Sequence, residues 1–498
     1  MGTANHILAL DQGTTSSRAI VFDQFARQLA IARQPTTQTY PRSGWVNQDA
    51  AEIWMTTLET AREALHQARL TGTNIGGIGI VNQRETLVVW DRQTNSAISP
   101  AIGWQSRQSQ PQVEALLARG MGPAYQSKTG LVPDAYFTAS KLAWLLEDQS
   151  DLRRRADAGE LLAGTVDSWL LWNLTGGAVH ATDVSNASRT MLFDIQTLDW
   201  SPELIQDMAI PHQILPQVMS SAGVAGFALP QLFGAEIPVS GIAGDQQAAL
   251  FGQTCFAPGE AKNTYGTGSF LLMNTGREMK RSSHRLLSTI AWQIEELVDY
   301  ALEGSVFISG AAVEWLRDGL GIIDEVQDVE PLAASVPDSG GVTVVPALTG
   351  LGAPHWDAAA RGTILGLTRG STAAHIARAT LEAIAFQTRD VTDAMTADSD
   401  IPLTSLRVDG GAARNDLLMQ VQADVLGVPV IRPQNVETTA VGAAFLAGLG
   451  CGLWPDQTFL ADRWAVDRVF EPAVGDAERE SRYANWRLAI ERSRGWAT

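Results

Sequence analysis

The pattern of apolar and polar positions near the start of the chain predicts a β-hairpin. Apolar residues fill positions 7–10 and 19–22, and they are separated by the polar stretch Asp11-Gln12-Gly13-Thr14-Thr15-Ser16-Ser17-Arg18. Two short β-prone runs joined through a glycine are typical of two strands and a tight turn. Backbone N–H groups and hydroxyls gathered at such a turn suit a phosphate group. Taken alone, the stretch also fits a solvated polar hairpin that binds nothing.

The same pattern returns in the second half of the chain. An extended run at 261–265 passes through Gly266-Thr267-Gly268-Ser269 into the apolar run 270–273. A phosphate loop in each half predicts two related domains that face each other, and 498 residues are too many for one ordinary core. We therefore expect an α/β protein in which residues 1–250 and 251–498 each form a domain with a mixed sheet and helices.

Two further strand ends carry candidate chemistry. The runs 75–81 and 86–90 are typical of strands, and between them Arg84 and Glu85 form either a surface ion pair or a clamp for a small polyol. In a clamp, the guanidinium donates to hydroxyl oxygens and the carboxylate accepts hydroxyl protons. The strand pattern at 237–242 leads to Asp245 at the start of a helical pattern. Asp245 is thus a candidate helix N-cap, a candidate general base, or both.

The later part of the chain predicts a nucleoside-binding turn and a buried helix. The strand pattern at 406–408 breaks into a pair of glycines, and Asn415 follows near the next helix. Glycine lets a flat ligand approach the backbone, and Asn415 can contact an adenine edge or a ribose, although a plain turn fits as well. The uncharged run 438–454 approaches membrane-spanning length. Its Gly and Ala content and the proline that follows it favour a tightly packed buried helix.

Composition and charge narrow the classes of function. The 36 basic and 54 acidic residues give a formal net charge of −18, which disfavours non-specific binding to nucleic acids or to anionic membrane surfaces. With the run 438–454 interpreted as a buried helix, we expect no integral membrane association. Two distant cysteines, Cys255 and Cys451, and the lack of a signal-peptide pattern predict a cytoplasmic protein without a disulfide framework. No Gly-Lys pair occurs, which excludes a P-loop kinase, and no Cys/His cluster indicates structural zinc.

Together these stretches resemble the FGGY carbohydrate kinases over nearly the whole chain. The resemblance is carried by Asp11-Gln12-Gly13-Thr14-Thr15-Ser16-Ser17-Arg18, Asn82-Gln83-Arg84-Glu85-Thr86, Gly241-Ile242-Ala243-Gly244-Asp245-Gln246-Gln247, Asn263-Thr264-Tyr265-Gly266-Thr267-Gly268, Asp409-Gly410-Gly411 and the segment 362–382. The Asn-Gln-Arg-Glu stretch is similar to that of family members that phosphorylate glycerol. Pentulose kinases carry a Gln-Met-His-Gly type of sequence there.

The resemblance implies a fold, a reaction and a set of ligands. The fold would be two actin-like (ribonuclease H-like) domains with the active site in the cleft between them. The reaction would transfer the γ-phosphoryl group of ATP to a terminal hydroxyl of glycerol, giving sn-glycerol 3-phosphate and ADP. Mg²⁺ would be held through water by Asp11, and the protein would be a homo-oligomer, a dimer or a tetramer.

The family's motifs also imply residue roles. Asp245 would take the proton from the attacking hydroxyl. The phosphates would be held by Thr14, Thr15, Ser16, Arg18 and Thr267, and the nucleoside site would be lined by Gly310, Glu314, Gly411 and Asn415. Glycerol hydroxyls would bind Arg84, Glu85, Tyr136, Asp245 and Gln246, with Trp104 and Phe270 packing against the glycerol carbons.

Two residues depart from the family's pattern, and two rival functions are open. Glu314 stands where the family often has Gln, and Glu236 stands where some bacterial members have an Arg that helps to bind an inhibitory sugar bisphosphate. One rival is an FGGY kinase for a larger sugar such as a pentulose, which the pair Arg84 and Glu85 disfavours. The other is a nucleotide-driven, non-kinase protein of the actin fold, which Asp245 and the polyol residues disfavour.

Overall fold

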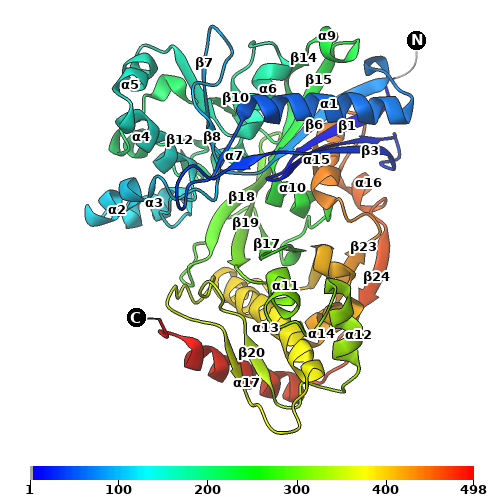
Figure 1. The fold of residues 1–498 in the computed structure, drawn as a ribbon. Coiled ribbons are helices and arrows are strands. Elements are labelled where there is room, and N and C mark those ends of the chain that lie inside the picture. The colour runs from blue at the N-terminus through cyan, green and yellow to red at the C-terminus, as the bar shows by residue number, and fades with distance from the viewer. Residues whose placement is uncertain (1–3, 498) are drawn as a thin grey trace.

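The strands of the first half form a mixed sheet, which occupies the upper part of Figure 1. The computed structural model describes residues 4–497. In the order β3-β2-β1-β6-β15, the first three strands are antiparallel, and β6 and β15 run parallel to β1. Strand β14 pairs antiparallel with β15. The bounds are β1 His6–Gln12, β2 Ser16–Phe22, β3 Gln28–Pro35, β6 Ile75–Asn82, β14 Ala222–Ala228 and β15 Ile237–Gly244.

The second half repeats this strand order. In β19-β17-β16-β22-β23, the first three strands are antiparallel, and β22 and β23 run parallel to β16. Strand β18 is added beside β19, and β24 beside β23. The bounds are β16 Glu260–Tyr265, β17 Ser269–Gly276, β18 Leu287–Ile294, β19 Leu297–Val306, β22 Ser405–Gly410, β23 Val430–Pro433 and β24 Val466–Phe470. The repeat confirms the prediction of a two-domain α/β fold with mixed sheets. The boundary at residue 250 stays a prediction.

The two predicted hairpins occupy the same place in the two units. Strands β1 and β2 join through the first polar turn, with Asp11 opposite Arg18, and β16 and β17 join through the second, with Tyr265 opposite Ser269. The two sheets meet between β14 and β18, where Ala222 pairs with Ile294. Across residues 4–497 this contact links thirteen strands into one sheet.

Strand β1 is buried on both faces. Leu8 and Leu10 belong to one apolar cluster with helix α1 (Ala50–Ala68), whereas Ile7 and Ala9 belong to another with helix α15 (Thr438–Gly450). Strands covered on both faces are apolar at successive positions rather than at alternate ones. This explains why the run 7–10 has no polar residue.

Helix α15 comes from the second half of the sequence but packs on the sheet of the first half. Figure 1 shows it beside β1 and helix α10 (Asp245–Gly252), which it contacts together with β6 and β15. The approach is close, because a Cβ added to Gly442 would lie 1.8 Å from the carbonyl oxygen of Ala248. The prediction of a buried, tightly packed helix is confirmed. Among the described residues, no helix has the length and apolarity needed to cross a bilayer.

Helices of the second half cover its sheet in the lower part of Figure 1. Helices α11 (Gly310–Asp318), α13 (Ala373–Ser399) and α14 (Asp416–Leu426) share an apolar cluster with β16, β17 and β22. Helix α17 (Asp476–Ser493) packs on α13, where Trp486 stacks on Phe386. The two cysteines are both free thiols.

Candidate active site

Arg84 and Glu85 lie in the turn that follows β6, and both side chains are buried. Their exposed fractions are 2% and 1%, so the interpretation as a surface ion pair is wrong. Glu85 has a φ of 60°, a left-handed conformation that is uncommon outside glycine. Its carbonyl oxygen accepts hydrogen bonds from Thr138 Oγ1 and from Lys141 Nζ, at 3.3 and 3.1 Å. The chain is thus held in an unfavourable conformation that turns both charged side chains inward.

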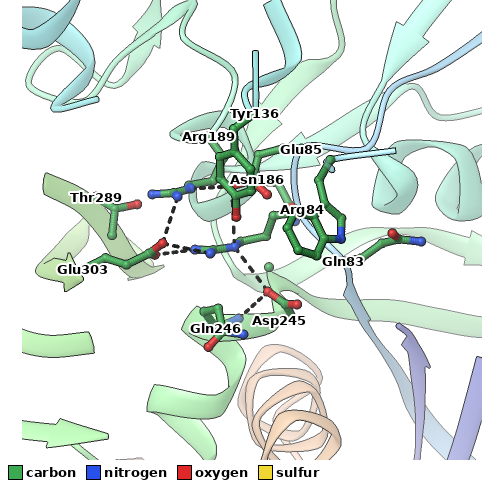
Figure 2. Close-up of polar contacts among 12 residues, drawn as sticks. Gln83, Arg84, Glu85, Tyr136, Asn186, Arg189, Asp245, Gln246, Thr289 and Glu303 are labelled. Carbon is green, nitrogen blue, oxygen red and sulfur yellow. Dashed lines mark hydrogen bonds and ion pairs between the residues drawn. The ribbon is translucent and has the colours of Figure 1, made fainter. Parts of the chain in front are cut away.

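A ring of ion pairs surrounds this turn, as Figure 2 shows. Arg84 donates from Nη1 and Nη2 to the two carboxylate oxygens of Glu303, at 2.6 and 3.0 Å. Arg189 donates from Nε to Glu85 Oε1 at 2.8 Å and from Nη2 to Glu303 Oε1 at 3.0 Å. Burial by itself would raise the pKa of Glu303, but Arg189 and Arg84 lower that pKa to about 2. The ring therefore holds its charges in fixed, ionised positions.

Asp245 is the first residue of α10 and touches the edge of this ring. Its Oδ1 lies 3.2 Å from Arg84 Nε and accepts from the N–H of Gln246 at 2.7 Å. Because α10 begins at Asp245, its N-cap is Gly244, so the prediction of Asp245 as the cap is wrong. Burial raises the pKa of Asp245 to about 6, against the lowering effect of Arg84. With 31% of its side chain exposed, Asp245 remains open to a substrate.

Lys262 on β16 lies beside Asp245 and Gln246. Its ammonium group donates to Gln246 Oε1, to Thr264 Oγ1 at 2.9 Å and to the carbonyl oxygen of Phe270 at 3.2 Å. Burial lowers the pKa of Lys262 to about 8. Two of the predicted glycerol residues, Gln246 and Phe270, are thus connected through one buried lysine.

Trp104 and Tyr136 connect the glycerol residues to the first phosphate loop. Their rings meet edge to face with centroids 5.6 Å apart. The indole Nε1 of Trp104 donates to Thr14 Oγ1 at 3.0 Å, so the ring is held against the phosphate hairpin. Lys141 donates to the carbonyl oxygen of Tyr136 as well as to that of Glu85. The structure therefore places these predicted residues together, with a buried lysine behind them.

The first phosphate loop is closed by its own backbone and flanked by charge. The N–H of Gly13 donates to the carbonyl oxygen of Ser16 at 3.0 Å, and Thr15 is exposed at the tip. Arg18 Nη1 pairs with Glu437 at 2.6 Å and lies 3.5 Å from Asp11 Oδ2. Among the described residues this Asp11 oxygen has no hydrogen-bond partner, and burial raises the pKa of Asp11. No group of three or more His, Cys, Asp or Glu side chains within 4–497 is arranged to hold a metal ion.

The predicted nucleoside residues line one cavity in the second unit. The cavity has a volume of ≈ 370 Å³, and its walls include Thr267, Gly310, Glu314, Gly411 and Asn415. The first phosphate loop does not line the cavity, whereas Thr267 of the second loop does, so the predicted phosphate residues are divided between the two units.

The backbone beside this cavity is shaped by a glycine pair. Gly410 has a φ of +87°, and an added Cβ would lie 2.3 Å from the carbonyl oxygen of Tyr265. An added Cβ on Gly411 would meet open space, which leaves room for a flat ligand. Asn415 caps α14 by accepting from the N–H of Leu418 at 2.8 Å, so its NH₂ donors remain for a ligand.

Sequence reasoning missed the residues behind the site. No role was predicted for Arg189, Glu303, Lys262 or Lys141, and each is buried. The available signal was a charged residue at an interior position of a strand, as Glu303 is in β19 and Lys262 is in β16. Such a charge requires a partner, because an unpaired buried charge is expensive.

Comparison with known proteins gives matches over the full length. The family model of the N-terminal domain of the FGGY family of carbohydrate kinases matches residues 6–252, and that of the C-terminal domain matches 261–451. A glycerol kinase of Aromatoleum aromaticum is 56% identical and glycerol kinase 2 of Thermotoga maritima is 55% identical, each with 99% of both chains covered. A crystal structure of Plasmodium falciparum glycerol kinase with ADP superposes with a TM-score of 0.93 at 34% identity, covering 99% of both chains.

Proposed function

We propose a function for this chain from one premise, that it belongs to the FGGY family of carbohydrate kinases. As an ATP-dependent phosphotransferase, it transfers the γ-phosphoryl group of ATP to a terminal hydroxyl of glycerol and releases sn-glycerol 3-phosphate and ADP. The observation that carries the proposal is the cluster in which the buried Arg84 and Glu85 lie beside the partly exposed Asp245. The full-length similarity to glycerol kinases supports the same substrate.

Asp245 is suited to the proton transfer. A general base works best when its pKa lies near the working pH, and the pKa of about 6 meets this condition while leaving the carboxylate ionised at neutral pH. Arg84 and Glu85 offer a donor and an acceptor for the glycerol hydroxyls, with Tyr136 and Gln246 beside them. Trp104 and Phe270 supply apolar surface for the carbons. Orientation of the hydroxyl toward the γ-phosphate then provides much of the rate enhancement.

The phosphates of ATP are assigned to the two hairpins and the nucleoside to the cavity of the second unit. Thr14, Thr15, Ser16 and Thr267 offer hydroxyls and backbone N–H groups, and Arg18 exchanges Glu437 for phosphate. Bound Mg²⁺ would neutralise charge on the transferred phosphoryl group. Asp11 fits this ion, because its Oδ2 is buried without a hydrogen bond among the described residues, and Mg²⁺ commonly combines one carboxylate with substrate phosphates.

Compartment and assembly are part of the proposal. We expect a cytoplasmic enzyme of glycerol metabolism and a homo-oligomer, either a dimer or a tetramer. Size-exclusion chromatography with light scattering measures the assembly.

A coupled assay of ADP release tests the activity. The purified chain is given ATP and Mg²⁺ with glycerol, dihydroxyacetone, xylulose or ribulose, and rates are compared at equal concentrations. We expect glycerol to give the highest kcat/KM, because the polar clamp discriminates strongly against ligands that leave its groups unpaired.

Two outcomes would replace the proposal. Preference for xylulose or ribulose would favour a pentulose kinase. ATP turnover that needs no polyol would favour a nucleotide-driven protein that is not a kinase.

A further inference from the structure

Glu303 contacts the predicted glycerol site from behind. It projects from β19, 219 positions away from Arg84 in the sequence, and only 3% of its side chain is exposed. Both of its oxygens are used by Arg84, and Oε1 also accepts from Arg189. Figure 2 shows Glu303 on the side of Arg84 away from Asp245. None of the motifs that predict the site includes this residue.

The position of Glu303 determines which nitrogens of Arg84 can contact Asp245. A guanidinium can bind a carboxylate through two parallel hydrogen bonds, which is the strongest arrangement of such a pair. Here the two terminal nitrogens of Arg84 face Glu303, and Nη1 also donates to Gln247 at 3.2 Å. Only Nε faces Asp245, at 3.2 Å. Arg84 therefore forms its two-bonded pair with Glu303 and a single contact with Asp245.

We propose that Glu303 is a positioning residue that keeps Asp245 available as the base. By occupying the terminal nitrogens of Arg84, it prevents a two-bonded pair between Arg84 and Asp245. Arg189 holds Glu303 in place and orients Glu85 at the same time. This inference rests on the proposed glycerol kinase activity and adds a residue to its mechanism.

The charges around Asp245 determine in which direction its pKa shifts when Glu303 is replaced. Three charged groups act directly on Asp245, namely Arg84, Glu85 and Lys262. Glu303 contacts Arg84, and Arg189 contacts Glu303 in turn. Loss of the Glu303 charge removes a negative group and frees two donors of Arg84 to pair with Asp245. Both changes favour the ionised carboxylate, and so the pKa of Asp245 falls. A carboxylate stabilised in this way is a weaker base.

The test is the pH profile of kcat/KM for glycerol in Glu303→Gln, compared with the wild type. We expect the fall in kcat/KM at acidic pH to begin at a lower pH in the variant. At the plateau, kcat/KM should drop roughly 30-fold or more, the effect of removing one partner of a buried charge pair. Glu296→Gln, in the exposed turn between β18 and β19, is the matched control and should keep the wild-type profile.

Arg189→Gln separates positioning from general damage to the buried ring. It removes a positive charge but leaves Glu303 on Arg84, so its acid limb should lie no lower than that of the wild type. Its KM for glycerol should rise, because Glu85 loses its hydrogen bond. A purely structural role predicts lower activity in both variants with an unmoved acid limb.

Folding is controlled by circular dichroism and by ATP affinity. If Glu303→Gln does not fold, Glu303→Asp replaces it, since the side chain keeps the charge but is one methylene shorter, which withdraws the carboxylate from the terminal nitrogens of Arg84. It should raise the KM for glycerol at least tenfold, through the same disturbance of the buried pair. Wild-type kinetics or an unshifted acid limb in a folded Glu303→Gln would overturn the inference, as would a wild-type KM in Glu303→Asp. Lack of glycerol phosphorylation by the wild type would instead reject the proposed function.

Discussion

Asp245 combines a substrate-accessible carboxylate with a raised pKa, and its replacement by asparagine has a clear expected result. Loss of a general base usually costs ~10²–10⁴ in rate. Asp245→Asn should therefore reduce kcat by this factor, while ATP affinity stays unchanged because the nucleoside cavity lies on the other unit. Single-turnover kinetics and ATP titration measure the two quantities. Turnover within a few-fold of the wild type would remove Asp245 from the mechanism.

The carboxylate of Asp245 should lower the free energy of unfolding at neutral pH. The pKa of Asp245 is about 6 in the folded protein and near 3.8 in a solvated aspartate. Between these values the folded state binds more protons than the unfolded state, so the free energy of unfolding decreases as pH rises. Asp245→Asn lacks this penalty, and its gain in Tm over the wild type should grow from pH 4 to pH 7 and then level off.

Thermal unfolding at several pH values measures this gain in Tm. The exposed Asp324→Asn is the control, and its difference from the wild type should not vary in this way. A gain that is the same at pH 4 and pH 7 would contradict the raised pKa.

The residues proposed to touch the substrate were easier to predict than the buried residues that contact them. Arg84, Glu85 and Asp245 each follow a strand in a short polar stretch, so local sequence identified them. Glu303 and Arg189 act on partners more than a hundred positions away, and no local pattern links them. Long-range pairing of buried charges is a property of the folded chain and must be read from structure.

At the scale of elements, the sequence predicted strands well and helix starts less well. The apolar run at 7–10 and the strand pattern at 237–242 mark β1 and β15, and both strands are largely buried. The start of α10 was predicted one residue late, because Asp is a common N-cap residue, whereas Gly244 is the cap and Asp245 is the first helical residue. Glycine has no side chain, so neither the end of the strand nor the cap could be predicted from Gly244.

The packing of α15 on α10 yields a prediction about one glycine. A Cβ at Gly442 would lie 1.8 Å from a backbone oxygen of α10, and backbone cannot move aside as a flexible side chain can. Gly442→Ala should therefore destabilise the protein by about 1–3 kcal/mol, the usual cost of overpacking a core. Gly370→Ala, where an added Cβ has no neighbour closer than 3.8 Å, is the control. Urea unfolding compares the two, and equal midpoints would show that α15 shifts to accept the methyl group.

At the scale of the whole molecule, the pair of hairpins predicted the two-unit plan, and the structure repeats one strand order in both halves. The position of α15 could not be predicted. An uncharged run indicates burial, but it does not say which sheet buries it. Because α15 lies in the second half of the sequence, one would expect it to pack on the second sheet, but it packs on the first.

The surface charge leads to a prediction about regulation. Glu236 is exposed in the link between α9 (Pro230–Phe233) and β15, at the position where responsive relatives would have arginine. A carboxylate there repels a phosphate instead of pairing with it, and the net charge of −18 adds no attraction. Millimolar fructose 1,6-bisphosphate should leave initial rates unchanged at saturating glycerol, at several protein concentrations. Inhibition at any of these concentrations would show that another cation supplies the missing charge.

The position of α15 on the first sheet also affects the order in which the protein can fold during synthesis. Strands β1 and β6 are complete by residue 82, but the helix that covers one of their faces begins at residue 438. At about 5–20 residues per second, the ribosome needs roughly 20–70 s to reach it. Throughout that interval the part of this apolar face that α15 covers lacks its partner. We therefore expect the first sheet to complete its packing only after residues 438–450 have left the ribosome.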